Sequence, residues 1–260
     1  MEKILQSYTP VSLEQMKAVR LMNRIDTKYV TTLPKLVRLL EMARDQYWVQ
    51  EIDGRRNMPY YTLYYDTERY DMYLEHLRGR KTRQKIRIRA YEHSGVSFLE
   101  VKNKNNKGRT AKKRVECAVG EKDGHTDFIA SHLHYAPDRL MNRIENRFTR
   151  ITLVNRNMTE RLTIDTNLRF HNFTTDTVCA LDGLVIIELK RDGQTFSPIL
   201  ELLRQLRIQP AGFSKYCMGM ALTDGELKKN RFKPRLRMIN KMCRVDYDSQ
   251  FTTEKQELSK

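Results

Sequence analysis

The 260-residue chain carries 48 Lys and Arg against 32 Asp and Glu, a formal net charge of +16, while 40% of its residues are hydrophobic. This composition excludes a disordered tail and provides enough apolar residues for a sizeable core. The cationic excess predicts an anionic partner, which charge alone leaves open as phosphates, nucleic acid or an acidic membrane surface.

Several protein classes are disfavoured by features that the sequence lacks. No apolar run approaches the ~20 residues that span a bilayer, and the N-terminus has no apolar signal region, so we expect a cytoplasmic protein without a membrane span. The cysteines show no CxxC spacing, which argues against a zinc site or a disulfide framework. No Gly-rich phosphate loop is present, so an anion site would have to use side chains.

In chain order, apolar residues at helical spacing predict helices over 11–20, 33–45, 67–78, 122–134, 196–206 and 215–222. Segments rich in Tyr, Val, Ile and Thr predict strands over 23–31, 60–66, 83–91, 96–104, 110–119, 147–154, 160–168 and 184–191. The tail is basic and then polar, with little periodicity. We therefore predict one domain over 1–225 and a solvated extension over 226–260.

Six of the predicted strands repeat one design, because successive strand side chains point to opposite faces. In KIRIRAY (85–91), Arg87 and Arg89 share one face, while Ile86 and Ile88 share the other. The charged faces of the six strands carry Arg83, Lys85, Arg87 and Arg89; Glu100, Lys102 and Lys104; Lys112, Arg114 and Glu116; Arg150; Arg161 and Asp165; and Glu188 and Lys190.

A single strand of this kind is typical of a sheet with one face in water. Six mostly cationic faces would instead repel one another across strands unless a polyanion neutralises them. Eight strands are about the number that closes a sheet around a narrow interior. We therefore predict an α+β fold: a closed eight-stranded antiparallel β-tunnel, cationic inside, with helices packed outside. Replacing Arg87 or Arg89 by Ala should then relieve repulsion, whereas truncating Ile86 or Ile88 should destabilise.

Eight segments together resemble a known family. They are NRIDTKYV (23–30), LYYDT (63–67), KIRIRAY (85–91), FLEVKNKNNKGRTAKKR (98–114), FTRITL (148–153), RLTIDTNL (161–168), IIELK (186–190) and GFSKY (212–216). In this order they are similar to the polyphosphate polymerase domain of the vacuolar transporter chaperone (VTC) group, within the triphosphate tunnel metalloenzymes. The resemblance implies transfer of the γ-phosphate of ATP to a growing polyphosphate chain, with release of ADP.

The resemblance also implies roles for individual residues. Glu188 corresponds to the carboxylate that holds Mn²⁺ or Mg²⁺, and Ser214 and Lys215 to a phosphate-contacting pair at the start of the last helix. The catalytic and phosphate-binding positions are Lys28, Arg87, Arg89, Lys102, Lys112, Arg150 and Arg161. Further phosphate ligands with less defined roles are Arg83, Lys85, Lys104 and Arg114.

Such a tunnel would work by positioning and charge neutralisation, as phosphoryl transfer requires. Glu100 or Asp165 could assist Glu188 at the metal, although a strand glutamate can instead simply pair with a cation. Ser214 can equally cap the following helix. The partners implied are ATP and polyphosphate, and coupling to translocation would need a separate membrane or regulatory protein.

Alternative functions remain open at this point. Related triphosphatases begin with a Glu-x-Glu-x-Lys strand, whereas this chain has Arg24-Ile25-Asp26-Thr27-Lys28, which favours the polymerase. A tunnel triphosphatase and a non-catalytic module that binds polyphosphate or inositol phosphates are the alternatives. A specific nucleic-acid reader is disfavoured, because no recognition motif is visible.

Overall fold

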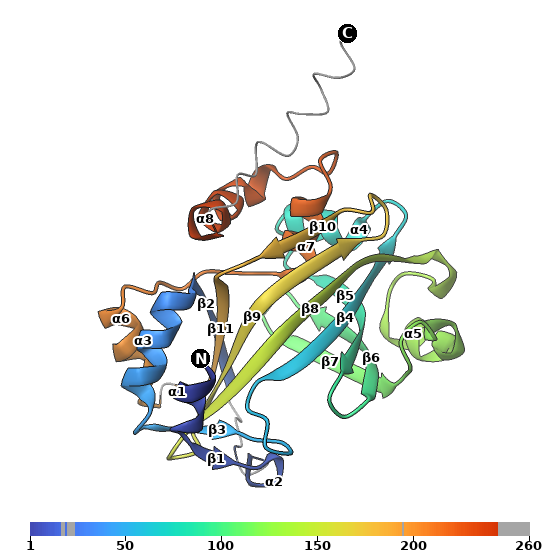
Figure 1. Ribbon diagram of the computed structural model, residues 1–260. Coiled ribbons are helices and arrows are strands. Elements are labelled where there is room, and N and C mark those ends of the chain that lie inside the picture. The colour runs from blue at the N-terminus through green and yellow to red at the C-terminus, as the bar shows by residue number, and fades with distance from the viewer. Residues whose placement is uncertain (17–18, 20–23, 194, 244–260) are drawn as a thin grey trace. The chain divides into compact units, whose positions relative to one another are not determined.

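Eleven strands and eight α-helices occur in residues 1–16, 19, 24–193 and 195–243, which the computed structural model describes (Figure 1). The strands are β1 (Thr9–Val11), β2 (Arg24–Thr32), β3 (Tyr47–Gln50), β4 (Met58–Thr67), β5 (Arg83–Tyr91), β6 (Val96–Lys104), β7 (Thr110–Glu116), β8 (Leu140–Asn155), β9 (Glu160–Asn172), β10 (Val178–Leu181) and β11 (Leu184–Asp192). The helices are α1 (Glu2–Gln6), α2 (Leu13–Met16), α3 (Leu33–Ala43), α4 (Asp71–Leu77), α5 (Thr126–His132), α6 (Pro198–Gln205), α7 (Lys215–Thr223) and α8 (Lys233–Cys243).

The chain divides into two units. Unit 1 comprises Met1–Met58, Phe148–Leu168 and Asp182–Phe213. Unit 2 comprises Pro59–Arg147, Arg169–Leu181 and Ser214–Lys260. The long strands β8 and β9 each contribute to both units.

The strands form one mostly antiparallel sheet in the order β2-β11-β9-β8-β4-β5-β6-β7. These eight are the eight strands predicted from sequence, and β1, β3 and β10 pair outside this path. The α+β class is confirmed, but the prediction of a closed eight-stranded tunnel is wrong: among the described residues the sheet has 11 strands and stays open. Six of the seven residues of β7 are exposed, and charged side chains on an edge strand oppose further pairing.

In unit 1, the apolar face of β8, β9 and β11 is covered by helices. Leu36, Leu39, Leu40 and Ala43 recur at helical spacing along α3 and are all buried. They pack in one cluster with α6 and with alternate strand residues such as Ile187. Figure 1 shows α3 and α6 side by side. The prediction that helices cover the apolar strand faces is therefore confirmed for unit 1.

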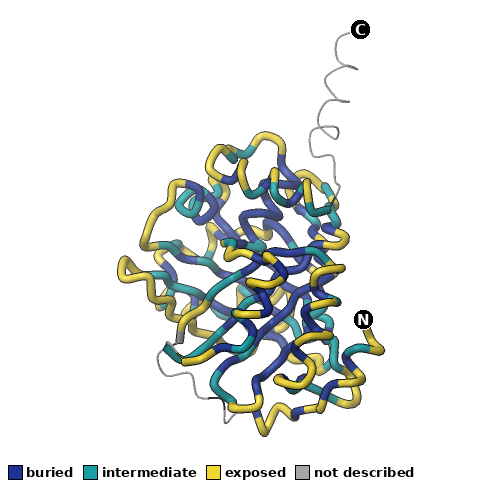
Figure 2. The backbone as a smooth tube through the Cα atoms, turned by 90° about the vertical axis from the view of Figure 1, so that its left-hand side faces the viewer, coloured by how far each residue is buried: buried dark blue, intermediate teal, exposed yellow. Residues whose placement is uncertain are grey.

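In unit 2, the apolar face of β5 and β6 is buried in the same way. Ile86, Ile88, Leu99 and Val101 are at most 1% exposed and cluster with Ile129 of α5. Figure 2 shows the dark blue buried residues concentrated in the strands and the yellow exposed residues at turns and helix surfaces. The alternation read from the sequence thus places the charged residues of β5 and β6 on the face away from α5.

The tail differs from its prediction. A 3-10 turn (Asn230–Phe232) and helix α8 occupy part of the segment expected to be a solvated extension. Phe232, Leu236 and Ile239 are buried, at the i, i+4 and i+7 spacing of a helix face. Residues 244–260 lie outside the described part, and the domain boundary at 225 stays a prediction.

Two N-terminal predictions fall partly outside the description. The helix expected over 11–20 is represented by α2 alone, since residues 17–18 and 20 are not described. The strand expected from residue 23 begins at Arg24 in the described part. No helix among the described residues is long and apolar enough to cross a membrane.

Candidate functional site

The charged face of unit 2 is built on a buried ion-pair cluster around Glu100. Arg87, directly opposite in the β5–β6 ladder, donates to Glu100 Oε2 from Nε (2.8 Å) and Nη2 (2.6 Å). Lys112 Nζ on β7 donates to Oε1 at 2.8 Å. Burial favours the neutral acid, yet Arg87, Arg89 and Lys112 hold the pKa of Glu100 well below its usual value. Glu100 is thus saturated by cations, which suits positioning of Arg87 and Lys112 better than metal binding.

The pKa of Tyr64 reflects the positive electrostatic potential of this face. It is buried on β4 opposite Arg87, which donates to the Tyr64 hydroxyl at 3.3 Å. Burial raises the pKa of a phenol, but the charges of Arg87, Arg89 and Lys215 outweigh it and lower the pKa of Tyr64. A positive potential that lowers the pKa of a buried phenol also favours a bound anion. Tyr64 lies within the LYYDT motif, yet no pattern singled it out from the sequence.

The start of α7 contributes the predicted Ser-Lys pair. Ser214 caps the helix by accepting from the Cys217 N–H at 3.2 Å, as anticipated. Lys85 Nζ donates to the same Ser214 Oγ at 2.7 Å. Ser214, Lys215 and Lys85 therefore meet on the charged face of unit 2.

A second buried carboxylate, which no sequence pattern singled out, anchors α7. Asp66 at the end of β4 accepts from the Tyr216 hydroxyl at 2.5 Å and from the Met72 and Tyr73 N–H groups at 3.0 and 2.9 Å. Tyr216 also stacks on Tyr64, with ring centroids 5.4 Å apart. Asp66 thus ties α7 and α4 to β4 and fixes the Ser214–Lys215 pair.

In unit 1, Glu188 lies at the centre of the charged face. On β11 it is opposite Lys28 of β2 and Thr163 of β9. Lys190 Nζ lies 3.1 Å and Lys28 Nζ 3.6 Å from its carboxylate. Although burial opposes ionisation, Lys190, Lys28 and Arg150 hold the pKa of Glu188 well below its usual value. Its side chain is 21% exposed, so the carboxylate is ionised and reachable by solutes.

The other predicted residues of unit 1 flank Glu188. Arg150 donates to both carboxylate oxygens of Asp165, at 2.6 and 2.8 Å, in a two-pronged pair. Arg161 lies opposite Lys190 in the β9–β11 ladder. Alternation along the sequence placed Lys190 on this face, but no motif assigned it a role in the site.

The carboxylate oxygens of unit 1 could bind a metal ion in one way only. Among the described residues, no three His, Cys, Asp or Glu side chains gather into a metal cage. Glu188 is the reachable ionised carboxylate, and Asp26 lies opposite Lys190, two register positions along β2. Mg²⁺ and Mn²⁺ prefer oxygen ligands, and Mg²⁺ characteristically binds one or two carboxylates plus substrate phosphates. Glu188 fits a cation whose remaining ligands come from phosphate oxygens and water.

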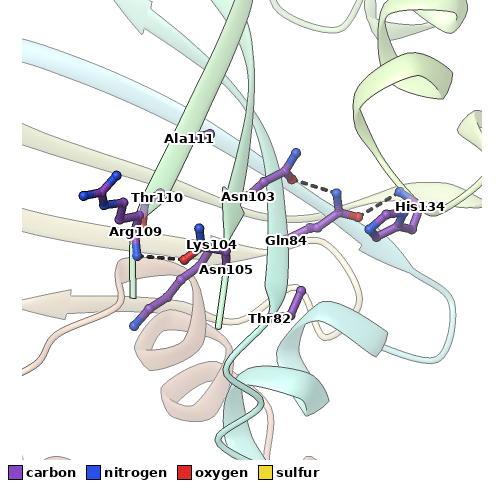
Figure 3. A pocket seen from close by; sticks show the side chains of 9 residues that line it. All are labelled: Thr82, Gln84, Asn103, Lys104, Asn105, Arg109, Thr110, Ala111 and His134. Atoms are coloured by element: carbon purple, nitrogen blue, oxygen red, sulfur yellow. Dashed lines mark hydrogen bonds between the residues drawn. The ribbon is translucent and has the colours of Figure 1, made fainter. Parts of the chain in front are cut away.

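The remaining predicted residues continue the unit 2 face toward one end of β5, β6 and β7. Lys85 lies opposite Lys102, and Lys102 opposite Lys112. Arg83 lies opposite Lys104, which also lines a cavity of about 480 Å³ (Figure 3). Arg114 lies opposite Glu100 in the β6–β7 ladder and is exposed, with its guanidinium 4.3 Å from the Phe98 ring centroid.

Comparison with known families identifies the chain. The model of the VTC domain matches residues 23–224, so the chain belongs to the VTC domain family. The family predicted from the sequence is confirmed.

Solved structures show a weaker similarity. A candidate adenylate cyclase of Vibrio parahaemolyticus is 10% identical, covering 76% of this chain and 99% of its own, at a TM-score of 0.45. One of Bacillus halodurans is 12% identical, covering 74% and 96%, at 0.48. A candidate adenylyl cyclase of Hippeastrum, described as having a dominant triphosphatase activity, is 16% identical, covering 79% and 97%, at 0.47. All three scores are below 0.5, so we base no argument on them. No curated protein matches the sequence.

Proposed function

We propose that this protein is a metal-dependent polyphosphate polymerase, which transfers the γ-phosphate of ATP to a growing polyphosphate chain and releases ADP. The observation that carries the proposal is the cationic face of unit 2, where Arg87 and Arg89 are only 7% and 8% exposed. Their charges and that of Lys215 overcome burial at Tyr64. Such a face suits a ligand with a negative charge at every repeat, and the family match supports the same ligand class.

The charged residues would act by holding phosphates in register. Arg87, Arg89, Arg150 and Arg161 can each present two donors to phosphate oxygens, whereas a Lys such as Lys28 offers a compact charge. Glu188 would hold Mn²⁺ or Mg²⁺, which supplies positive charge to the phosphate oxygens that it bridges. Lys102, Lys112 and Lys215 would neutralise neighbouring phosphates along the chain.

The pairing of the carboxylates favours polymerisation over hydrolysis. Activation of water calls for a general base, but Glu100, Asp165 and Glu188 are each ion-paired with Arg or Lys. The neighbouring cations hold the pKa values of Glu100 and Glu188 well below their usual range, so these two carboxylates are poorly suited to accept a proton. An acceptor phosphate is already ionised and needs no base.

The test is to measure all products of one reaction. Purified protein with ATP and Mn²⁺ should yield ADP in step with acid-labile polymer, and little orthophosphate. Glu188→Gln should lower turnover about 100-fold or more, on the scale of losing a preorganised electrostatic group. The matched control, Glu201→Gln, removes an exposed glutamate of α6 that pairs with Arg204 and should leave turnover unchanged. Orthophosphate as the main product would instead identify a triphosphatase, and binding without turnover a sensor.

A further inference from the structure

Helix α8 presents a stripe of cations on its exposed face. Lys233, Arg237 and Lys241 follow one another at four-residue spacing and all three are exposed. Leu236 and Ile239, on the other face of the helix, are buried. Helix α8 lies at the periphery of unit 2 (Figure 1) and beyond residue 224, where the family match ends. The stripe therefore belongs neither to the family match nor to the charged strand faces described above.

This stripe lowers the intrinsic stability of its own helix. Residues four apart on a helix are neighbours, so Arg237 stands between two like charges, and α8 contains no Asp or Glu to offset them. Lys233 is in the first turn, where the partial positive charge of a helix N-terminus disfavours a cation. Buried side chains next to the helix hold it in place, such as Phe232, whose ring centroid lies 5.7 Å from that of Tyr73. An anionic surface would offset the repulsion within the stripe.

The beginning of α8 adjoins a second group of exposed cations. Arg231 Nη1 donates to the Arg78 carbonyl and lies 2.8 Å from the position that a Cβ on Gly79 would take. Arg78, Arg80 and Lys81 are exposed and follow the end of α4 with no acid between them. Two segments thus contribute exposed cations to one surface, which we call the α8 surface and which comprises Arg78, Arg80, Lys81, Lys233, Arg237 and Lys241.

The row of residues beside the stripe is apolar. Pro234, Met238 and Met242 each follow a cation of the stripe; Pro234 is exposed and the two methionines are half-buried. A bilayer surface matches both rows, because anionic headgroups attract Lys and Arg while the boundary of the acyl region accepts apolar side chains. Polyphosphate and a nucleic-acid backbone match only the cations. Protein interfaces are enriched in aromatic anchors, and α8 contains no Phe, Tyr or Trp.

We propose that the α8 surface docks the protein on a bilayer that contains anionic lipids. The attachment is electrostatic and peripheral, so it is reversed by salt. It does not depend on the proposed polymerase activity, since the α8 surface lies outside the charged faces that would hold ATP and polyphosphate. Docking would bring the chemistry of those faces to a membrane surface.

Cosedimentation of the full chain with vesicles tests the proposal. At an ionic strength of about 0.1 M, the parent should pellet with vesicles that contain phosphatidylserine and stay in solution with vesicles of phosphatidylcholine alone, and high salt should release it. Each cation removed should weaken binding about fivefold. We therefore expect a loss of about 100-fold in the triple variant Lys233→Gln, Arg237→Gln and Lys241→Gln.

A matched control removes the same charge elsewhere. Lys35→Gln, Arg38→Gln and Arg44→Gln together neutralise three exposed cations on and next to α3, and should weaken vesicle binding less than about threefold. The Tm of the α8 triple variant should hold or rise, because like-charge neighbours are removed. Should it fall instead, Arg237→Gln alone, with its fivefold effect, tests the surface.

Two further measurements separate the bilayer from other partners. Met238→Gln should weaken vesicle binding about fivefold, the scale of burying part of an apolar side chain, and leave binding of single-stranded DNA unchanged. Excess tripolyphosphate, which would occupy the charged face, should leave vesicle binding unchanged at constant ionic strength.

The proposal would be overturned by equal effects of the two triple variants, by displacement with tripolyphosphate, or by a parent that does not prefer vesicles with phosphatidylserine. Binding of DNA that is lost in the α8 triple variant, in a parent that does not bind vesicles, would assign the surface to nucleic acid instead. Because these measurements need no ATP, their outcome is separate from that of the polymerase assay.

Discussion

Replacing Arg87 by Ala would remove two hydrogen bonds to Glu100 and one to the Tyr64 hydroxyl from a buried site. The repulsion argument predicted that this change leaves the unliganded protein as stable or more so. The structure contradicts that expectation for Arg87, because Glu100 is 0% exposed and would keep Lys112 as its main partner. Removing one partner of a buried pair costs about 3–5 kcal/mol, and the remaining Lys112 contact favours the lower end, about 3 kcal/mol.

Thermal and urea unfolding of the unliganded protein measure this cost. A loss of about 3 kcal/mol corresponds to a fall of about 6–12 °C in Tm for a chain of this size. Adding Glu100→Gln to Arg87→Ala removes the uncompensated charge and should recover part of the stability. Arg89→Ala should cost less, since it leaves the Arg87–Glu100 pair in place. An Arg87→Ala protein as stable as its parent would refute the reasoning.

Three further predictions concern stability. Because the pKa of Glu100 is depressed, its ion pairs stabilise the protein fully above the ordinary carboxyl range near pH 4.5, and this stabilisation is lost as pH falls. The free energy of unfolding should therefore fall less steeply with acidification in Arg87→Ala than in the parent. Parallel pH dependences of the two proteins would count against this role of Glu100. Ile88→Ala, in the core under α5, should cost about 2–4 kcal/mol in urea unfolding, and a neutral effect would place the residue elsewhere. Gly219→Ala would put a Cβ 2.5 Å from Phe170 Cδ1 and 2.7 Å from Ile144 Cδ1, so overpacking should cost about 1–3 kcal/mol and lower Tm.

The strands were predictable because period-two alternation is local. The bounds of β5 and β6 match the predicted ranges residue for residue. Within β5, Ile86 and Ile88 lie on one face of the sheet and Arg87 and Arg89 on the other. Closure of the sheet was not predictable, since it depends on how the edge strands end. Helix α8 was missed because its two buried apolar residues, Leu236 and Ile239, are interspersed with Lys and Arg, which lowers the apparent periodicity.

The candidate site was predictable in residue type but not in pairing. Sequence alternation placed Arg150 and Asp165 on charged faces, but only the side-chain contacts in the structure show that they bind each other. Tyr64, Asp66 and Tyr216 are single buried polar residues that follow no repeat, so tertiary contacts alone assign them to the site. The functional roles of Lys28, Glu188 and the other predicted residues stay predictions until they are tested in the protein.

The most direct test of the central claim is the fate of the terminal phosphate of ATP. The protein is incubated with Mn²⁺ and ATP labelled at the γ-phosphate or, in a parallel reaction, at the α-phosphate, and acid-labile polymer is separated from small products. The account predicts γ-label in the polymer, all α-label in ADP and remaining ATP, and loss of polymer labelling in Glu188→Gln. Recovery of the γ-label as orthophosphate, with none in polymer, would contradict it.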